Sequence, residues 1–350
     1  MSDTVYIDGS YGEGGGQIIR TALALAAITG RAVEIGNIRA GREKPGLQPQ
    51  HLAAVRVAAA VCDAEVAGAA TQSMHLHFRP RTQPLADAYT LDIGTAGAIP
   101  LVLQTALLPL SLADGPSSLH VIGGTHVPFA PVIEYVESVY LPLLQRAGVT
   151  ARCQSGRAGY RQRGGGEVTM AVTPASALHP LTLTERGKLL GVKATIITSE
   201  LPEHVGERGA AAVERALHGI GRRIAIEQHP LPSLAPGAAI LVTVECEHTR
   251  AGFSALGERG KPMERVAEEA AHAFLRWWKT GAACDEHLAD QLVLPLALAP
   301  GESRWTTPTA TEHLRTVIWT VQQFLDVKAE MTERADGGWM VVMEGAGIMG

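Results

Sequence analysis

The chain has 350 residues, of which 46% are hydrophobic and 19% charged, so it is long enough for one large domain or two ordinary ones. Its net charge of −5 excludes a protein that is basic all over, so any contact with nucleic acid must come from a local patch. The four cysteines lack metal-binding spacing, and neither a secretion signal nor an apolar run of about 18 residues is present, so we expect a soluble, cytoplasmic protein without disulfides or membrane contact.

The first distinctive segment is a glycine-rich loop between a predicted strand and a predicted helix. Five of the eight residues 9–16 are glycine, and helix formers follow. Such a loop brings backbone amides and a helix N-terminus close to an anion, although the Walker lysine and the dinucleotide fingerprint are both absent. Glu13 would repel a phosphate unless a divalent metal lay between them, so we predict that Glu13 is a metal ligand. The alternative is a tight turn with a solvated glutamate.

The second segment is a basic loop over residues 38–51. Arg39, Arg42 and Lys44 lie among glycines and prolines, and Gln50 and His51 follow at the start of the next helix. Residues 31–56 contain five Lys or Arg against two Glu, in a chain that is acidic overall. Guanidinium groups suit phosphates, so the loop is a candidate anion site. The alternative is an ordinary solvated loop.

The order of elements repeats along the chain. Residues 5–41 and 89–125 both have the pattern of strand, small-residue loop, helix and strand, and residues 287–307 have a shorter version. Residues 48–80, 128–174 and 309–344 each switch from helical to alternating periodicity, which predicts a helix and then two strands. We therefore predict an α+β fold of three repeats, each with two helices on a four-stranded sheet. Chance similarity of Ala/Gly-rich helices is the alternative.

A segment between the second and third repeats fits neither pattern. Residues 184–280 predict a strand, a helix, two strands and a helix, with a proline-rich loop inside. We expect an inserted small domain over 184–280 and a large domain formed by 1–183 and 281–350.

Several polar residues of the predicted helices are candidates for chemistry. Asp290 and Gln291 open an apolar helix, where an aspartate is most simply an N-cap, and Gln104 lies in the equivalent helix of the second repeat. His313 begins a later helix, in the place that His51 has in the first repeat. A neutral imidazole can act as a nucleophile, but a first-turn histidine more often caps or packs. The zinc-protease, serine-hydrolase and lysine nucleotidyl-transferase motifs are all absent.

Several long motifs in one order show a resemblance that covers roughly residues 5–345. They are "DGSYGEGGGQIIR", "IRAGREKPGLQPQHL", "VLQT", "GGTHVPFAP", "LADQLVLPLALA" and the helix of His313. With these motifs the chain resembles the RNA 3′-terminal phosphate cyclase family. The resemblance implies three repeats with an inserted domain before the third, in agreement with the pattern above. It also implies ATP-dependent conversion of an RNA 3′-phosphate to a 2′,3′-cyclic phosphate, through histidine–AMP and RNA-(3′)pp(5′)A intermediates.

The resemblance also assigns roles to residues. His313 would be the nucleophile, and Glu13 would bind a divalent metal, Mg²⁺ or Mn²⁺. The positions that match nucleotide-binding places are Gln104, Pro131, His287, Leu288, Ala289, Asp290 and Gln291. The positions that match the lining for phosphates and the RNA end are Arg20, Arg39, Arg42, Gln50 and His51. The expected ligands are ATP, the metal and RNA 3′-phosphate ends.

One position departs from the family pattern. His287 stands where the family typically has a tyrosine against the adenine, and an imidazole offers less stacking area. Two rival interpretations remain: an enolpyruvyl transferase, which resembles the predicted architecture alone, and a non-catalytic RNA-binding or ribosome-assembly relative. Such inactive relatives lack the nucleophilic histidine, so the presence of His313 favours an enzyme.

Overall fold

The computed structural model describes residues 4–335 and 337–348. The strands of this part of the chain form four sheets of four strands each. Three of the sheets share one order, in which the first strand pairs with the second, the fourth follows and the third lies at the far edge. In all three, the first and second strands are parallel and the other pairs are antiparallel. The α+β fold built from repeats is therefore confirmed.

The first two repeats follow the predicted order of elements. The first repeat comprises β1 (Val5–Asp8), α1 (Gly16–Thr29), β2 (Val33–Gly36), α2 (Pro49–Val61), β3 (Glu65–Ala67) and β4 (Leu76–Arg79). The second comprises β5 (Ala88–Asp92), α3 (Ile99–Ser111), β6 (Ser117–Gly123), a helical run, β7 (Thr150–Arg157) and β8 (Gly166–Thr173). That helical run is α4 (Ile133–Tyr135), the π-helical η1 (Val136–Tyr140) and α5 (Leu141–Arg146).

The third repeat is interrupted near its start. Its first strand is β9 (Thr182–Leu183), which pairs with β14 ahead of the inserted segment. The remaining elements are α8 (Glu286–Gln291), α9 (Val293–Leu298), β14 (Pro300–Thr307), α10 (Glu312–Gln322), β15 (Lys328–Glu333) and β16 (Trp339–Ala346). The insertion therefore lies inside the third repeat, whereas the sequence suggested a position before it. A strand of two residues is too short to show a period.

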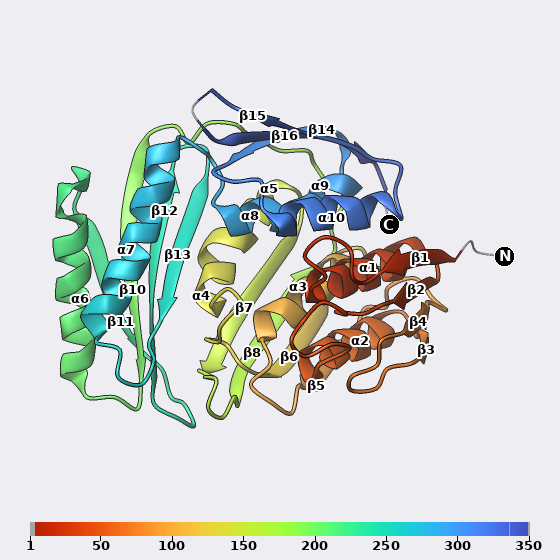
Figure 1. Cartoon of the computed structure of the whole chain (residues 1–350), viewed down its shortest axis with the longest axis horizontal. Coiled ribbons are helices and arrows are strands. Elements are labelled where there is room, and N and C mark those ends of the chain that lie inside the picture. The colour runs from red at the N-terminus through yellow and green to blue at the C-terminus, as the bar shows by residue number, and fades with distance from the viewer. Residues whose placement is uncertain (1–3, 336, 349–350) are drawn as a thin grey trace.

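The inserted segment has its own sheet and core. It comprises β10 (Leu189–Ser199), α6 (Glu203–Leu217), η2 (His218–Ile220), β11 (Ile224–Pro230), β12 (Gly237–Cys246), β13 (Arg250–Leu256) and α7 (Met263–Thr280). Its strand order is β11-β10-β12-β13, and its two long helices pack on the sheet around Phe274 and Val213. The edge strand β13 was not predicted. Figure 1 shows the segment extending from one end of the molecule.

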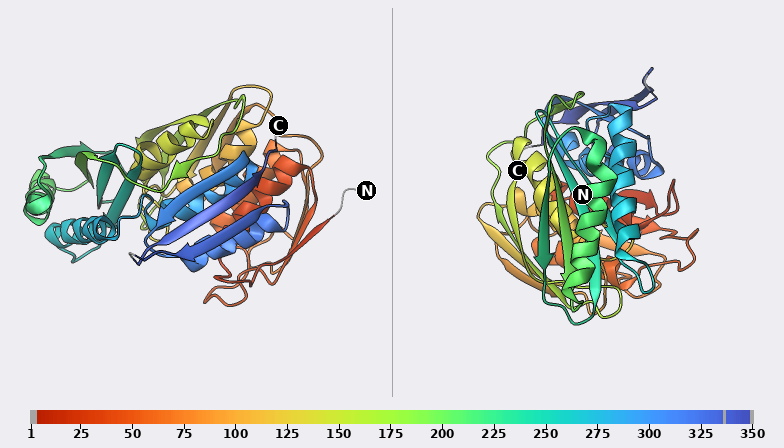
Figure 2. Two further views of the ribbon diagram at one scale, coloured as in Figure 1. Left: turned by 90° about the horizontal axis from the view of Figure 1, so that it is seen from above. Right: turned by 90° about the vertical axis from the view of Figure 1, so that its left-hand side faces the viewer.

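The three repeats pack with their helices inside and their sheets outside (Figure 1). Figure 2 shows the sheet of the third repeat lying over these helices. Buried and exposed residues alternate along β1 and β8, as expected for strands with one face on a core. Helix α1 contacts α2, α3 and α10, and its residues 18–28 are all buried. This packing places the glycine-rich loop, which leads into α1, beside the first turns of α10.

Candidate functional site

The glycine-rich loop of the first repeat is docked on helix α10 of the third. Gly12 has a φ of +55°, and a Cβ at this position would collide with the Thr316 hydroxyl. The Glu13 amide donates to Thr316 Oγ1 at 3.2 Å, and the Tyr11 ring stacks on Trp319 with centroids 3.9 Å apart. Thr316 and Trp319 follow His313 in steps of three residues, so they lie near one face of α10. One helix therefore supports both the loop and His313.

Glu13 lies between Arg42 and His313. Its Oε1 pairs with Arg42 Nη2, which also donates to the Glu13 carbonyl oxygen at 2.8 Å. His313 Nε2 lies 2.9 Å from Glu13 Oε2. That carboxylate oxygen is buried and accepts no hydrogen bond from the described residues. The structure thus brings together the predicted metal ligand, the predicted nucleophile and one predicted phosphate-binding arginine.

Asp290 faces the other side of the His313 ring. Its Oδ2 lies 3.6 Å from His313 Nδ1, which is longer than a hydrogen bond. Burial raises the pKa of Asp290 to about 6, while His313, His287 and Arg20 act in the opposite direction. Burial also lowers the pKa of Arg20 to about 10, with Asp290 opposing. A buried arginine and a buried carboxylate therefore flank the histidine.

The electrostatics keep the His313 ring neutral near neutral pH. Burial lowers the pKa of His313 from its ordinary value; Asp290 opposes this shift, and Arg20 and Arg42 add to it. The side chain is still 46% exposed, so a ligand can reach it. A neutral, accessible imidazole beside two arginines can attack an electrophile that carries negative charge.

His51 is fixed inside the protein. It is 2% exposed, and its Nδ1 accepts a hydrogen bond from the Gln48 amide at 3.0 Å in a capping box. Burial, together with Arg20 and Arg39, lowers the pKa of His51 to about 3. The ring also leaves no room for a Cβ at Gly16. His51 therefore supports the start of α1 as a neutral, packed side chain.

The other residues of the basic loop are not all directed at His313. Arg39 has a φ of +53°, and its Nη1 donates to the carbonyl oxygens of Lys44 at 2.5 Å and Gly46 at 3.0 Å, which braces its own loop. Gln50 Oε1 lies 3.5 Å from the Ala98 amide at the start of α3. Among the described residues, Arg20 and Arg42 act electrostatically on His313, whereas Arg39 acts on His51.

Two glutamines and their neighbours surround a small internal cavity. Gln104 Nε2, Gln291 Oε1 and Arg20 Nε are buried and have no hydrogen-bond partner in the described chain. All three residues, with Asp290, line a cavity of about 30 Å³, which is room for a water molecule. Helices of all three repeats therefore converge on one set of unpaired polar groups.

The remaining predicted nucleotide-binding positions differ in exposure. Leu288 and Ala289 are fully buried within α8, so their side chains belong to the core. The His287 side chain is 71% exposed. Pro131 is half-buried on the segment that leads into α4. Of these four positions, His287 and Pro131 are therefore the ones that are accessible to a nucleotide base.

The interpretation of Asp290 as a helix N-cap was wrong. Helix α8 begins earlier than expected, and its N-cap is Asp285, which accepts hydrogen bonds from the amides of His287 and Leu288. Asp290 lies near the C-terminal end of α8 instead, with its carboxylate buried. Sequence reasoning missed Asp285, although an aspartate just before Glu-His-Leu is an N-cap signal. It also missed Thr316 and Trp319, which the three-residue spacing from His313 could have revealed.

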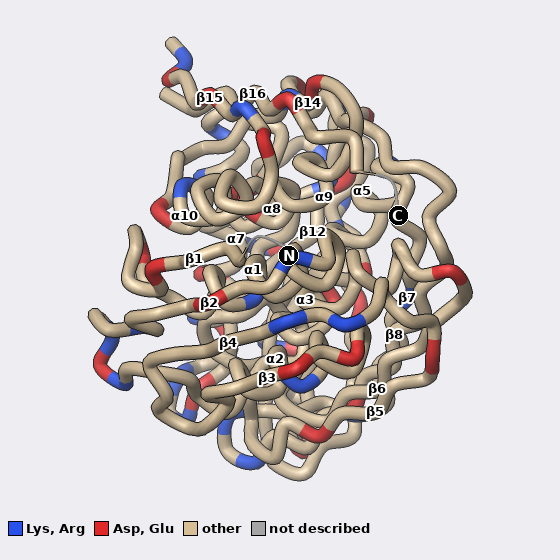
Figure 3. The backbone as a smooth tube through the Cα atoms, turned by 90° about the vertical axis from the view of Figure 1, so that its right-hand side faces the viewer, with Lys and Arg blue, Asp and Glu red and all other residues tan. Residues whose placement is uncertain are grey.

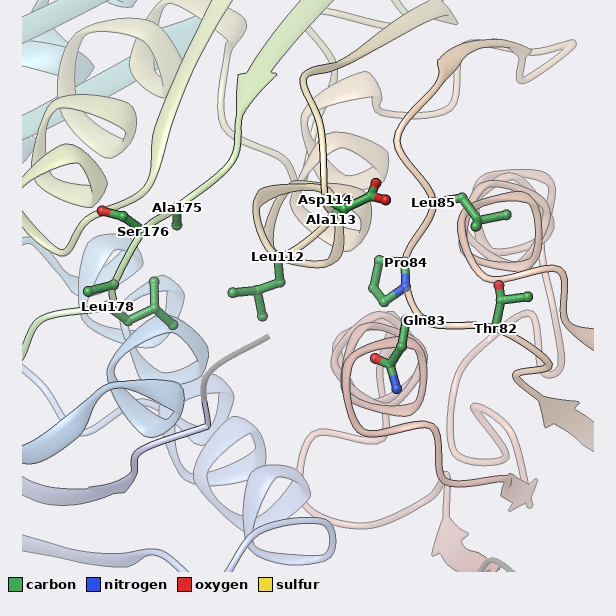
Figure 4. A pocket seen from close by; sticks show the side chains of 11 residues that line it. Thr82, Gln83, Pro84, Leu85, Leu112, Ala113, Asp114, Ala175, Ser176 and Leu178 are labelled. Atoms are coloured by element: carbon green, nitrogen blue, oxygen red, sulfur yellow. The ribbon is translucent and has the colours of Figure 1, made fainter.

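A larger cavity lies away from these groups. Its volume is about 430 Å³, and Figure 4 shows it lined by side chains that include Leu85, Leu112 and Leu178 at the C-terminal end of α3. Asp114 is the one ionisable side chain among the described residues that line it. Figure 3 shows positive and negative residues interspersed along the backbone. The cluster around His313 is therefore the better candidate for chemistry.

The fold and the site define a class: an α+β protein of three repeats, whose helices converge on an accessible histidine between two carboxylates and two arginines. A family model described as RNA 3′-terminal phosphate cyclase matches residues 11–331. The chain belongs to the RNA 3′-terminal phosphate cyclase family. No helix among the described residues is long and apolar enough to span a bilayer.

Curated relatives match over most of their length, and each carries the name RNA 3′-terminal phosphate cyclase. The protein of Methylococcus capsulatus is 48% identical, over 91% of this chain and 90% of the relative. That of Nostoc punctiforme is 45% identical over 91% and 94%, and that of Pyrobaculum neutrophilum 44% over 98% and 99%. Among solved structures, the enolpyruvyl transferase NikO from Streptomyces tendae is 10% identical and matches 97% of this chain but 48% of its own. Its TM-score of 0.37 is too low to support a conclusion.

Proposed function

We propose that this protein converts the 3′-terminal phosphate of RNA to a 2′,3′-cyclic phosphate, with ATP as co-substrate and His313 as nucleophile. Membership of the family supports the overall reaction. The observation that carries the mechanism is the placement of His313, with Nε2 facing Glu13 and Nδ1 facing Asp290. ATP is the co-substrate that the resemblance to the family implies, and arginines beside a nucleophilic ring suit its phosphates.

The residues present fit a nucleotide and a divalent metal. Buried polar atoms normally have partners, so the unpaired atoms of Arg20, Gln104 and Gln291 favour a polar ligand or its bound water. The buried Oε2 of Glu13 lies 2.9 Å from His313 Nε2 but accepts no hydrogen bond from the described residues, which favours a cation there. Within the described chain no group of three or more His, Cys, Asp or Glu is arranged for a metal. That is compatible with Mg²⁺ or Mn²⁺ held by one carboxylate, substrate phosphates and water.

In the first step, His313 attacks the α-phosphorus of ATP. For Nε2 to attack, the proton must be on Nδ1, on the side of Asp290, and the Glu13 oxygen that lies 2.9 Å from Nε2 must give way to the phosphate. The bond from Nε2 to phosphorus forms as the bond from that phosphorus to the bridging oxygen breaks, and pyrophosphate leaves. Arg20 and Arg42 offset negative charge on the phosphoryl oxygens. The metal at Glu13 would supply further charge neutralisation there.

The next two steps move AMP to the RNA end and then release it. An oxygen of the RNA 3′-phosphate attacks the adenylyl phosphorus, the bond to Nε2 breaks, and His313 is regenerated. The adjacent 2′-hydroxyl then attacks the 3′-phosphorus, loses its proton and expels AMP, which closes the cyclic phosphate. This last step is intramolecular, so it gains from proximity without a second nucleophile from the protein.

The adenine is expected to lie between His287 and the segment of Pro131. A histidine gives less stacking area than the tyrosine typical of the family, so we expect weaker discrimination among nucleoside triphosphates. The exposed position of the His287 ring supports this role.

The deciding experiment is intact mass measurement after incubation with ATP and Mg²⁺ or Mn²⁺, followed by mapping of the modified peptide. We expect one AMP on His313, and conversion of RNA with a 3′-phosphate, but not a 3′-hydroxyl, to the cyclic end. An adduct on another residue would reassign the nucleophile. Absence of any adduct from protein that is shown to be folded would exclude this mechanism and would favour a non-catalytic RNA-binding role.

A further inference from the structure

Asp285, a buried carboxylate outside the proposed chemistry, joins three parts of the molecule. It is 1% exposed and caps α8, with Oδ1 accepting from the amides of His287 at 3.1 Å and Leu288 at 2.8 Å. The Tyr135 hydroxyl of α4 lies 3.0 Å from Oδ1 and 3.1 Å from Oδ2. The Gly252 amide of β13 donates to Oδ2 at 3.2 Å. The third repeat, the second repeat and the inserted segment thus share one carboxylate.

The contact between the inserted segment and α4 is close. A Cβ at Gly252 would lie 2.6 Å from Tyr135 Cδ2 and 2.9 Å from Val139 Cγ2, so the backbone of β13 lies directly against this helical run. A glycine is required where a backbone approaches a ring this closely. The position of Tyr135 relative to β13 is therefore fixed by packing as well as by Asp285.

The inserted segment also holds the two residues that precede Asp285. Thr249 Oγ1 donates to the Ala283 carbonyl oxygen at 3.0 Å, and Trp277 Nε1 donates to the Cys284 carbonyl oxygen at 3.0 Å. With the Gly252 amide, these bonds give the inserted segment three points of attachment to residues 283–285. The start of α8 is thus oriented by the inserted segment.

These contacts bear on the proposed nucleotide site because the segments that Asp285 connects include residues expected to contact the nucleotide. Helix α8 carries His287 and Asp290, and Pro131 lies four residues before Tyr135. Burial raises the pKa of Asp285, although His287 and the hydrogen bonds from Leu288, Gly252 and Tyr135 favour the carboxylate. A buried carboxylate is unfavourable unless its lone pairs are satisfied. The donors supplied by α4 and β13 are therefore needed to hold α8 in this position.

We propose that Asp285 is a positioning residue for the nucleotide, through which the inserted segment and α4 set the placement of His287 and Asp290. The inserted segment then acts as a support for the ATP site. This inference rests on the proposed function, because it assigns nucleotide contacts to α8 and the Pro131 segment. Asp285 itself touches no reacting atom.

The decisive variant is Asp285→Asn. Asparagine is a strong N-cap, so its carbonyl oxygen preserves the bonds to His287 and Leu288. Its amide nitrogen replaces Oδ2 and brings a donor against the Gly252 amide, which is also a donor. The cap is thus kept while the hydrogen bond from Gly252 of the inserted segment is lost. We expect the KM for ATP in RNA cyclisation to rise about 10-fold to 100-fold, as for a lost hydrogen bond to a charged group, with kcat changed less than about threefold.

Tyr135→Phe provides a second test if the asparagine variant folds poorly. It removes one donor to Asp285 but retains the ring against Gly252, so a smaller rise in KM for ATP, about threefold to tenfold, is expected. The control is Arg208→Ala, which breaks an exposed ion pair with Glu264 between α6 and α7 of the inserted segment. This control should leave the KM for ATP unchanged.

The readouts separate a positioning role from a purely structural one. Each variant is assayed for melting temperature, for the fraction that forms adduct at saturating ATP, and for KM. If both Asp285→Asn and Tyr135→Phe lower the melting temperature or the active fraction but leave KM unchanged, the inference is overturned. An equal rise in KM in the Arg208 variant would also overturn it. If wild-type protein forms no adduct, the proposed function fails. If wild-type protein forms the adduct and KM is unchanged in Asp285→Asn and Tyr135→Phe, only the role of Asp285 fails.

Discussion

His51 and His313 occupy equivalent helices of two repeats, yet their surroundings differ. Each lies in the first turn of the second helix of its repeat, α2 and α10. His51 is 2% exposed with Nδ1 bonded to its own helix start, whereas the His313 side chain is 46% exposed. Burial lowers the pKa of both rings, that of His51 to about 3. The repeated fold supplies the position, and the neighbouring repeats decide what the ring can do.

The difference arises from which part of the glycine-rich segment 9–16 packs against each ring. In the first repeat, Gly16 lies directly against His51 and closes it off. In the third repeat, the loop that approaches His313 comes from the first repeat and presents a carboxylate, Glu13. The site is therefore formed between repeats, and an isolated repeat would lack it. A repeated sequence pattern can reveal where equivalent histidines lie but not which of them is accessible.

The largest expected effect is on adduct formation, when each of the two histidines is replaced in turn by asparagine. His313→Asn removes the nucleophilic nitrogen, so adduct formation should fall by more than about a thousandfold. His51→Asn retains an acceptor for the Gln48 amide and loses mainly packing, so adduct formation should fall less than about 30-fold, with roughly 1–2 kcal/mol lost in the free energy of unfolding. Radiolabelled ATP and urea unfolding measure both quantities. Comparable loss of adduct in the two variants would mean that the distinction drawn between them is wrong.

A smaller effect is expected from Asp290→Asn, which tests the contribution of the neighbouring carboxylate to the reactivity of His313. The carboxyl group of Asp290 has a pKa raised by burial from 3.8 to about 6. The unfolded chain therefore loses this proton near pH 4 and the folded protein near pH 6, so stability falls as pH rises through that window and remains lower above it. Asp290→Asn should raise the free energy of unfolding at pH 8 by up to about 3 kcal/mol.

The same substitution should impair chemistry. Loss of the carboxylate beside Nδ1 should slow adduct formation about 10-fold to 100-fold at pH 8. In wild-type protein, adduct formation should decline below about pH 6 as Asp290 takes up a proton. Protonation of His313, whose pKa is lowered by burial, adds to this decline at acid pH. The Asp290→Asn variant should lack the contribution of Asp290 to the decline. Rate-against-pH profiles and denaturant midpoints provide the measurements. A variant that is both less stable and fully active would contradict the assigned role.

The sequence predicted long elements better than the contacts between them. Most helices of the repeats were identifiable as runs of helix-forming residues, and α1 and α3 are buried on nearly all sides. Strand β9, with two residues, and edge strand β13 were missed because short or edge strands show little alternation. The start of α8 was misplaced because Asp290 competes with Asp285 as a cap signal. The contacts Glu13–His313 and Asp285–Gly252 depend on packing between distant segments, which no local pattern encodes.

The smallest expected effect concerns the hydrogen bond between the glycine-rich loop and Thr316, which is present beside His313 and has no counterpart beside His51 among the described residues. Thr316, one turn after His313, accepts the hydrogen bond of the Glu13 amide at 3.2 Å. Helix α2 touches the loop through the packing of His51 on Gly16, without a comparable hydrogen bond among the described residues. Thr316→Val keeps the shape and removes this acceptor, at about 1 kcal/mol. We expect a threefold to fivefold rise in the concentration of divalent metal needed for half-maximal adduct formation, because Glu13 is less well held.

Thr320→Val is the matched control for this last substitution. Thr320 lies one turn further along α10, is buried, and donates only to the Thr316 carbonyl oxygen, at 2.8 Å. It should lower stability by a similar amount and leave the metal titration unchanged. A parallel shift in both variants would indicate general loosening of α10. A shift confined to Thr316→Val would show that α10 positions the carboxylate as well as the ring, which is what distinguishes it from α2.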